Sequence, residues 1–116
     1  MKKLFLFVLL ATAIFSCKKS NENWQQAAAN PEFLRRTQSQ LTESIIHDIF
    51  APPVSSRIYM YSALAAYEAL AAGNTNYQSM VGQLKGFKKV AKPEAGKEYS
   101  YPVAAVRAYL TIGKNL

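Results

Sequence analysis

The stretch that most constrains the fold is a run of fourteen residues, 59–72, that is apolar around nearly the whole circumference of a helix. Thirteen of these residues are apolar or carry a hydroxyl, and Glu68 is the only charge among them. A helix of this kind is buried against neighbours on several faces. The rest of a 116-residue chain supplies few such neighbours. We therefore expect this helix to need more partners than the chain itself provides.

Helix start and stop signals predict an all-α fold, an antiparallel helical bundle fragment of about four helices after a cleaved signal peptide. Asn30 caps the first helix, and the Pro52-Pro53 pair ends it. Gly73 ends the second, Ser100 caps the last, and Gly113 supplies its C-cap. The expected helices cover residues 31–50, 54–72, 77–84 and 101–113.

Apolar spacing assigns the faces of the first and last helices. The first carries a stripe at three- and four-residue spacing, formed by Leu34, Thr37, Leu41, Ile45 and Ile49 and widened by Phe33, Ile46 and Phe50. The stripe of the last helix is formed by Val103, Val106, Tyr109 and Leu110. Both stripes are expected to face the core of the bundle.

The N-terminus is typical of a bacterial lipoprotein signal peptide, residues 1–16. Lys2 and Lys3 precede an apolar core of twelve residues, 4–15, which is too short for a comfortable membrane span of ~20 residues. Ile-Phe-Ser-Cys then places the chain's only cysteine, Cys17, where a lipobox needs it. The pattern predicts lipidation of Cys17, a polar tether over residues 17–30 and a lipid-anchored place in the bacterial cell envelope. An ordinary secretory leader with a coincidental cysteine is the alternative.

The chain is basic, but its charge does not form a nucleic-acid-binding motif. The formal net charge of +7 falls to +5 when Lys2 and Lys3 leave with the leader. The densest basic run, residues 85–89, could touch phosphate or an anionic lipid surface, and its plainer reading is a solvated loop. Because no RNA-binding, zinc-finger or basic-zipper pattern is present, we expect no nucleic-acid partner.

Four titratable residues stand out as structural candidates. His47, the only histidine, follows Glu43 by four residues, which favours a contact between them, and it adjoins Asp48. His47 and Asp48 could have a catalytic role, or His47 could be a polar-face or capping residue. The second role is favoured, because the sequence has no second histidine and no nucleophile motif. Arg57 and Glu68, on the apolar second helix, are expected to be buried ions that need partners elsewhere.

Two segments carry a resemblance to a known family. HDIFAPPVSSRIYMYSALAAYEAL and the later LKGFKKVAKPEAGKEYSYPVAAVRAYLTIGK resemble the N-terminal region of bacterial vanadium-dependent haloperoxidases, members of the phosphatidic acid phosphatase type 2 superfamily. The resemblance covers residues 31–116. It implies an all-α bundle whose vanadate or phosphate site is built in a C-terminal half.

The catalytic motifs of that family are absent from these 116 residues. The family uses a Lys with an Arg-Pro motif, a Pro-Ser-Gly-His motif and a Ser-Arg followed six residues later by His. Here no Arg precedes Pro, no Ser-Gly-His occurs, and Ala63 stands six residues after Ser56-Arg57. No catalytic, cofactor-binding or metal-binding residue can therefore be assigned, and whether the chain belongs to an enzyme stays open.

The resemblance predicts a truncated N-terminal helical part, residues 31–116, of a membrane-anchored haloperoxidase-like protein. The full-length protein would bind vanadate and oxidise halides with peroxide, or hydrolyse phosphate esters, while this fragment alone would be inactive. Its expected partners are the membrane, through Cys17, and the missing C-terminal helical half. The alternative is a small lipidated helical binding module of the envelope, complete as written. The exposed apolar faces of residues 54–72 count against it unless the chain oligomerises.

Overall fold

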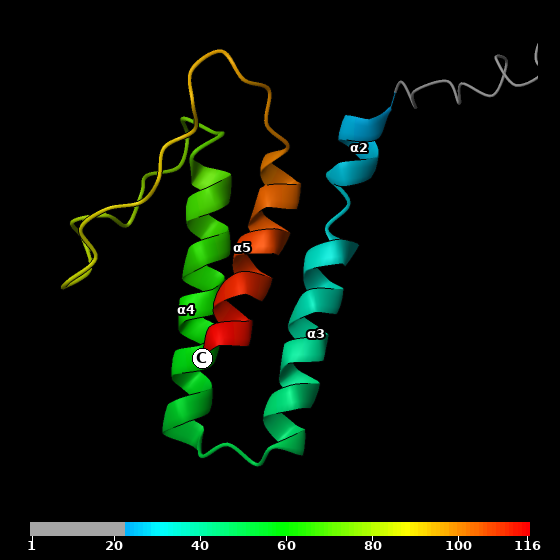
Figure 1. The fold of residues 1–116 in the computed structure, drawn as a ribbon, viewed down its shortest axis with the longest axis vertical. Coiled ribbons are helices and arrows are strands. Elements are labelled where there is room, and N and C mark those ends of the chain that lie inside the picture. Colours follow the sequence, from blue (N-terminus) through cyan, green and yellow to red (C-terminus); the bar gives the residue numbers. More distant parts are fainter. Residues whose placement is uncertain (1–22) are drawn as a thin grey trace, which may run out of the picture.

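The computed structural model describes residues 23–116, and every regular element in them is a helix. The elements are α2 (Trp24–Ala28), α3 (Glu32–His47), α4 (Pro52–Ala71) and α5 (Tyr101–Asn115). Helices α3 and α4 form an antiparallel pair, and α5 runs back antiparallel to α4 (Figure 1). The predicted all-α bundle fragment is confirmed for this part of the chain. The predicted leader and Cys17 lie outside the described residues.

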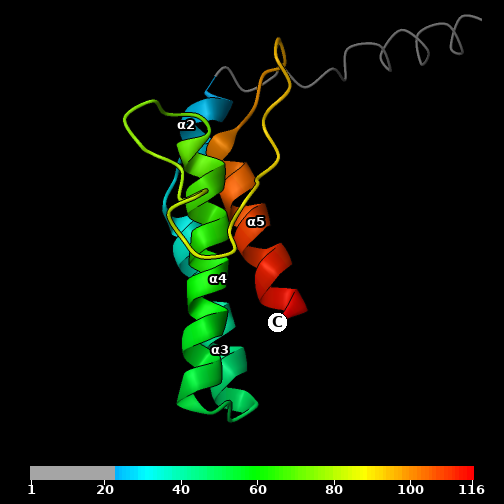
Figure 2. The same cartoon turned by 90° about the vertical axis from the view of Figure 1, so that its left-hand side faces the viewer.

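Helix α5 organises the packing. It lies chiefly along α4 and to a lesser extent along α3, on one side of the α3–α4 pair (Figure 2). The centre of the contact is small, formed by Ala66 of α4 with Ala105 and Tyr109 of α5. Leu34 and Leu41 of α3 pack against this cluster. The side of the α3–α4 pair opposite α5 is left without a covering helix among the described residues.

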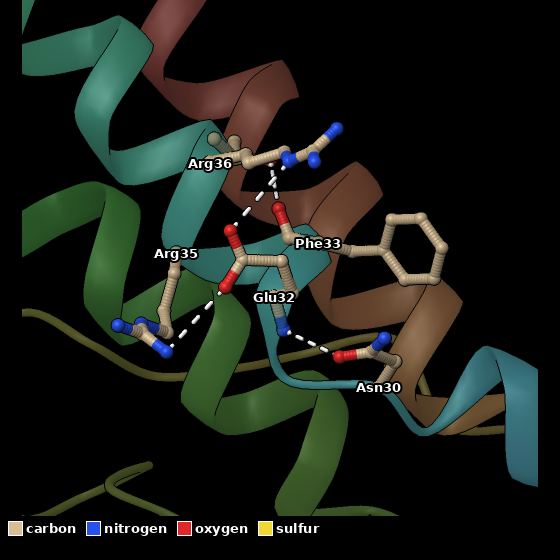
Figure 3. A network of polar contacts seen from close by, with 6 residues as sticks. Asn30, Glu32, Phe33, Arg35 and Arg36 are labelled. Atoms are coloured by element: carbon tan, nitrogen blue, oxygen red, sulfur yellow. Dashed lines mark hydrogen bonds and ion pairs between the residues drawn. The ribbon is translucent and has the colours of Figure 1, made fainter.

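Helix α3 begins one residue later than predicted, with Pro31 at the N-cap position, and Asn30 contributes a side-chain hydrogen bond to its start. The Glu32 backbone N–H donates to Asn30 Oδ1 at 2.9 Å (Figure 3). The Glu32 carboxylate forms ion pairs with both neighbouring arginines, at 3.4 Å from Arg35 Nη1 and 3.5 Å from Arg36 Nε. These pairs are exposed and contribute little energy. Both arginines lie on the solvent side of α3, as the apolar stripe predicts.

Helix α3 ends at His47, three residues before the predicted end. Ile49 adopts a positive φ of 53°, and the Phe50 N–H donates to Ile45 O at 3.2 Å while the Ile49 N–H donates to Ile46 O at 3.2 Å. These paired bonds are those of a left-handed C-terminal turn, a position that glycine usually occupies. The sequence has no glycine here, so the spacing alone did not predict the stop.

Replacing Ile49 with glycine should therefore stabilise the protein. An L-residue in the left-handed conformation costs about 1–2 kcal/mol, and glycine adopts it freely at a smaller entropic cost of about 0.5–1 kcal/mol. We expect Ile49→Gly to raise the free energy of unfolding in urea by about 0.5–1 kcal/mol. The control is Ile46→Gly, within the helix, which should lower it by about 1 kcal/mol. A lower free energy of unfolding for Ile49→Gly would show that the backbone at Ile49 is not strained.

The helix predicted over residues 77–84 does not form. Residues 72–100 connect α4 to α5 through turns and extended backbone only. Gly82 takes a φ of +80°, and its N–H donates to Phe87 O at 2.9 Å, which closes a turn. A residue in the left-handed conformation interrupts an α-helix. The segment therefore forms no helix, although its apolar residues have helical spacing.

Helix α5 begins where predicted but continues past Gly113 to Asn115. Gly113 is therefore not a C-cap. It lies against Leu41 and Ser62, where an added Cβ would come within 3.3 Å of both side chains. Ser62 is fully buried, and its hydroxyl has no hydrogen-bond partner. The small residue lets the end of α5 approach both other long helices.

Gly73 marks the end of α4, as predicted, and its lack of a side chain is also needed for packing. A Cβ at Gly73 would lie 2.3 Å from Cδ2 of Tyr101, at the start of α5. We expect Gly73→Ala to lower the free energy of unfolding by about 1–3 kcal/mol, because the ring must move. In a Tyr101→Ala background the same change should cost much less, so a double-mutant cycle measures the clash. An equal loss of stability from Gly73→Ala in both backgrounds would show that the Tyr101 ring is not the cause.

Much of the predicted apolar surface stays exposed. The buried apolar residues among those described are Ile45, Ile58, Ala66, Ala105 and Tyr109. Met60 and Tyr61 on α4 are 51% and 42% exposed, so α4 is covered on one side only.

Within residues 23–116, no helix has both the length and the apolar character needed to cross a membrane.

Candidate functional site

The predicted pair His47 and Asp48 lies at the exposed end of α3. His47 Nδ1 is 2.9 Å from Asp48 Oδ1, with the two side chains 87% and 56% exposed. The ring pairs with Asp48 and not with Glu43, contrary to the predicted contact. Both groups face solvent next to the α3–α4 turn, and no cluster of three potential metal ligands occurs among residues 23–116. The surroundings fit the polar-face role better than a catalytic one.

Of the two predicted buried ions, only Glu68 is buried. Its relative exposure is 5%, whereas Arg57 is exposed on α4 and makes no ion pair with any described residue. The expectation for Arg57 was wrong, because the side of α4 on which it sits has no covering helix. Glu68 finds its partners in the connection: Ser79 Oγ donates at 2.7 Å and the Met80 N–H at 2.6 Å.

A groove lies between α3 and α4, and we call it the α3–α4 groove. It has a volume of about 490 Å³ and is mostly apolar. Its lining residues are Leu34, Gln38, Thr42, Tyr59, Ala63, Ala66, Tyr67, Leu70 and Tyr109. All three long helices contribute, and the groove opens where no described helix covers the pair. Its shape and composition suit an apolar partner.

Three tyrosines contribute hydroxyl groups to the α3–α4 groove, beside the polar side chains of Gln38 and Thr42. Tyr59 donates its hydroxyl to Thr42 Oγ1 at 2.9 Å, which links α4 to α3. Tyr67 donates to Gln78 O at 2.8 Å, which links α4 to the connection. Burial raises the pKa of Tyr109 above its ordinary value of 10.0, and neighbouring Tyr59 raises that pKa further. The hydroxyls of Tyr59 and Tyr67 therefore act as structural donors that tie α4 to its neighbours.

A second hollow lies between the C-terminal end of α4 and the connection, and we call it the lysine cleft. Its volume is about 880 Å³. Four lysines and three tyrosines line it, together with small apolar side chains; these seven residues are Lys88, Lys89, Lys92, Lys97, Tyr77, Tyr99 and Tyr101. Buried Glu68 also lines it. Lysines beside apolar and aromatic side chains favour an anionic, amphipathic ligand.

Sequence reasoning did not identify either hollow. The basic run at residues 85–89 was a signal for the lysine cleft, but it did not show that Tyr99 and Tyr101 return to the same place. The eight-residue spacing of Tyr59 and Tyr67 was a signal for the α3–α4 groove, since that spacing puts both on one face of a helix. The residues that complete each hollow come from segments distant in the sequence.

Compared with known proteins, the chain matches no family model, no curated protein and no solved structure.

Proposed function

We propose that this chain is the N-terminal helical scaffold of a membrane-anchored protein similar to vanadium-dependent haloperoxidases of the phosphatidic acid phosphatase type 2 superfamily. The full-length protein would oxidise halides with peroxide or hydrolyse phosphate esters. A lipid on Cys17 would hold it in the bacterial envelope. The observation that carries the proposal is the α3–α4 groove, an apolar hollow across three helices with no cover among the described residues.

The exposure of α4 supports the same proposal. Its sequence is that of a helix buried on several faces, yet Met60, Tyr61 and Leu70 are 51%, 42% and 38% exposed. Exposed apolar residues on a helix of this kind favour a missing partner. A C-terminal helical half that packs into the groove would supply it, with this chain contributing packing and not chemistry.

The residues present do not themselves fit vanadate. An oxyanion needs several cationic or N–H donors around it, and the family's covalent attachment needs a histidine. The only histidine here lies 2.9 Å from the carboxylate of Asp48, an anionic neighbour that opposes an oxyanion. Arg57 is exposed on α4 and belongs to neither hollow. Vanadate would belong to the C-terminal half, and this chain carries no step of its chemistry.

Two experiments test the proposal. The intact mass of the native protein, extracted from membranes in detergent, should be several times that of residues 17–116. The purified 116-residue chain should show no vanadate-stimulated bromide oxidation above a protein-free blank. A native mass equal to residues 17–116 plus lipid would overturn the scaffold reading, and so would halide oxidation by the short chain.

The second candidate is a small lipidated helical binding module of the envelope. The lysine cleft favours it, because that hollow is formed wholly by described residues and needs no further chain. This reading predicts the short native mass and one cooperative thermal transition for residues 18–116. Non-cooperative melting of that segment would argue against it, and the exposed face of α4 would then need an oligomer or another partner.

A further inference from the structure

The connection between α4 and α5 is unusually long for a compact helical protein. It covers residues 72–100 without a helix or strand. Structureless connections beyond about 12–15 residues are uncommon in compact domains and are usually functional or disordered. Residues 78–80 of this connection are held to the bundle by the two hydrogen bonds to Glu68 and by the Tyr67 bond to Gln78. A defined shape in such a segment points to a binding function.

The connection is also the most basic part of the described chain. It contains five lysines and two glutamates, a net charge of +3. The two carboxylates that line the lysine cleft are already engaged, since Glu68 accepts from Ser79 and Met80, and Glu94 pairs with Lys97. Lys88, Lys89 and Lys92 form no ion pair with any described residue. Their charges are available to an anionic ligand.

We propose that the lysine cleft binds the headgroup of an anionic phospholipid. The lysine ammonium groups would contact the phosphate, because charge-assisted hydrogen bonds to phosphate are strong. Tyr77, Tyr99 and Tyr101 would border the glycerol and first acyl carbons, since tyrosine pairs an apolar ring with a polar tip. The volume of about 880 Å³ exceeds what a bare phosphate needs and leaves room for the rest of a headgroup.

The position of the cleft in the fold suits a membrane surface. Helix α2 lies at the end of the bundle where α4 ends and α5 begins (Figure 1). Gln25 of α2 donates to Glu98 of the connection at 3.4 Å. Cys17 precedes Trp24 by seven residues, a reach of at most about 25 Å. A lipid anchor on Cys17, which belongs to the proposed function, would hold the connection close to the bilayer. The unpaired lysines favour an anionic ligand with or without that anchor.

Lysine labelling in vesicles tests the proposal on the full chain. The protein, purified in maltoside, is placed in vesicles of phosphatidylcholine alone or with one-third phosphatidylglycerol, and amine acetylation is followed by mass spectrometry. Lys88, Lys89 and Lys92 should label several-fold more slowly in anionic vesicles, with Lys114 unchanged as an internal control. Inorganic phosphate added to the phosphatidylcholine vesicles should give no protection. Protection by phosphate alone would assign a free-anion site instead, and equal protection of Lys114 would mean diffuse attraction.

A matched pair of triple variants gives a second, independent measurement. Lys88→Gln/Lys89→Gln/Lys92→Gln removes the three lysine charges of the cleft that form no ion pair, whereas Arg57→Gln/Arg107→Gln/Lys114→Gln removes three charges elsewhere on exposed positions. Titration of each in detergent with short-chain phosphatidylglycerol should show affinity roughly 100-fold weaker for the cleft variant. The control should retain binding within a few-fold, and raised salt should weaken binding in both. Equal losses in the two variants would overturn the proposal.

Discussion

Replacing Glu68 with alanine is expected to release the connection from the bundle and to lower the free energy of unfolding by about 3 kcal/mol or more. The carboxylate is 5% exposed and accepts two short hydrogen bonds, 2.7 Å from Ser79 Oγ and 2.6 Å from the Met80 N–H. Hydrogen bonds to a charged group contribute about 1.5–3 kcal/mol each. Alanine removes both and leaves the two donors without an acceptor.

Urea unfolding and trypsin cleavage would measure the two effects of Glu68→Ala separately. Cleavage after Lys85 or Lys88 should accelerate strongly, because these residues lie on the segment that Ser79 and Met80 hold in place. Glu43→Ala is the matched control, since Glu43 is exposed on α3 and should change stability by less than about 0.5 kcal/mol. Ser79→Ala removes one donor and should cause part of the loss. Unchanged cleavage in Glu68→Ala would show that the connection is held by other contacts.

Glu68 also shows what could be read from the sequence and what could not. A lone carboxylate in an apolar helix predicts burial with a partner, because an unpaired buried charge is very costly. That expectation is confirmed. The identity of the partner depends on the path of residues 72–100, which no periodicity encodes. The same reasoning failed for Arg57, because it assumed that all sides of α4 are covered.

The faces of the helices were predicted unevenly for a related reason. On α3 the centre of the stripe is correct, with Thr37 and Ile45 buried, but Ile49 at its end is 87% exposed. On α5 the large Val103 and Leu110 were expected inside and are 52% and 49% exposed. Periodicity ranks residues by apolar character, so it favours large side chains over small ones.

The actual α4–α5 contact uses small residues that such a ranking overlooks. Ala66 and Ala105 are 4% and 1% exposed, and they bring the two backbones close together. Gly73 and Gly113 act in the same way at the two ends of α5. The alanines of α4 did predict close helix approach. The sequence did not show which helix would approach, because that depends on three-dimensional packing.

Tyr109 is the one large side chain in this contact, and its truncation should be the most damaging change in α5. It is 5% exposed, packs with Ala66 and Ala105, and lines the α3–α4 groove. Removing a buried aromatic ring costs about 3–5 kcal/mol. We expect Tyr109→Ala to lower the free energy of unfolding by about 3 kcal/mol, since the groove allows some relaxation. Tyr61→Ala, at a 42% exposed position on α4, should cost less than about 1 kcal/mol.

The Tyr109→Phe variant separates the ring from its hydroxyl. It keeps the packing, so its stability at pH 7 should stay within about 1 kcal/mol of the parent. Because burial raises the pKa of Tyr109 above 10.0, the unfolded chain loses this proton before the folded one does. Stability of the parent should therefore fall as the pH rises through 10 toward the folded pKa, and the phenylalanine variant should lack this part of the decline. Identical pH profiles would show that the hydroxyl is solvated in the groove. If Tyr109→Phe at pH 7 lost as much stability as Tyr109→Ala, the stabilising contact would involve the hydroxyl oxygen and not the ring.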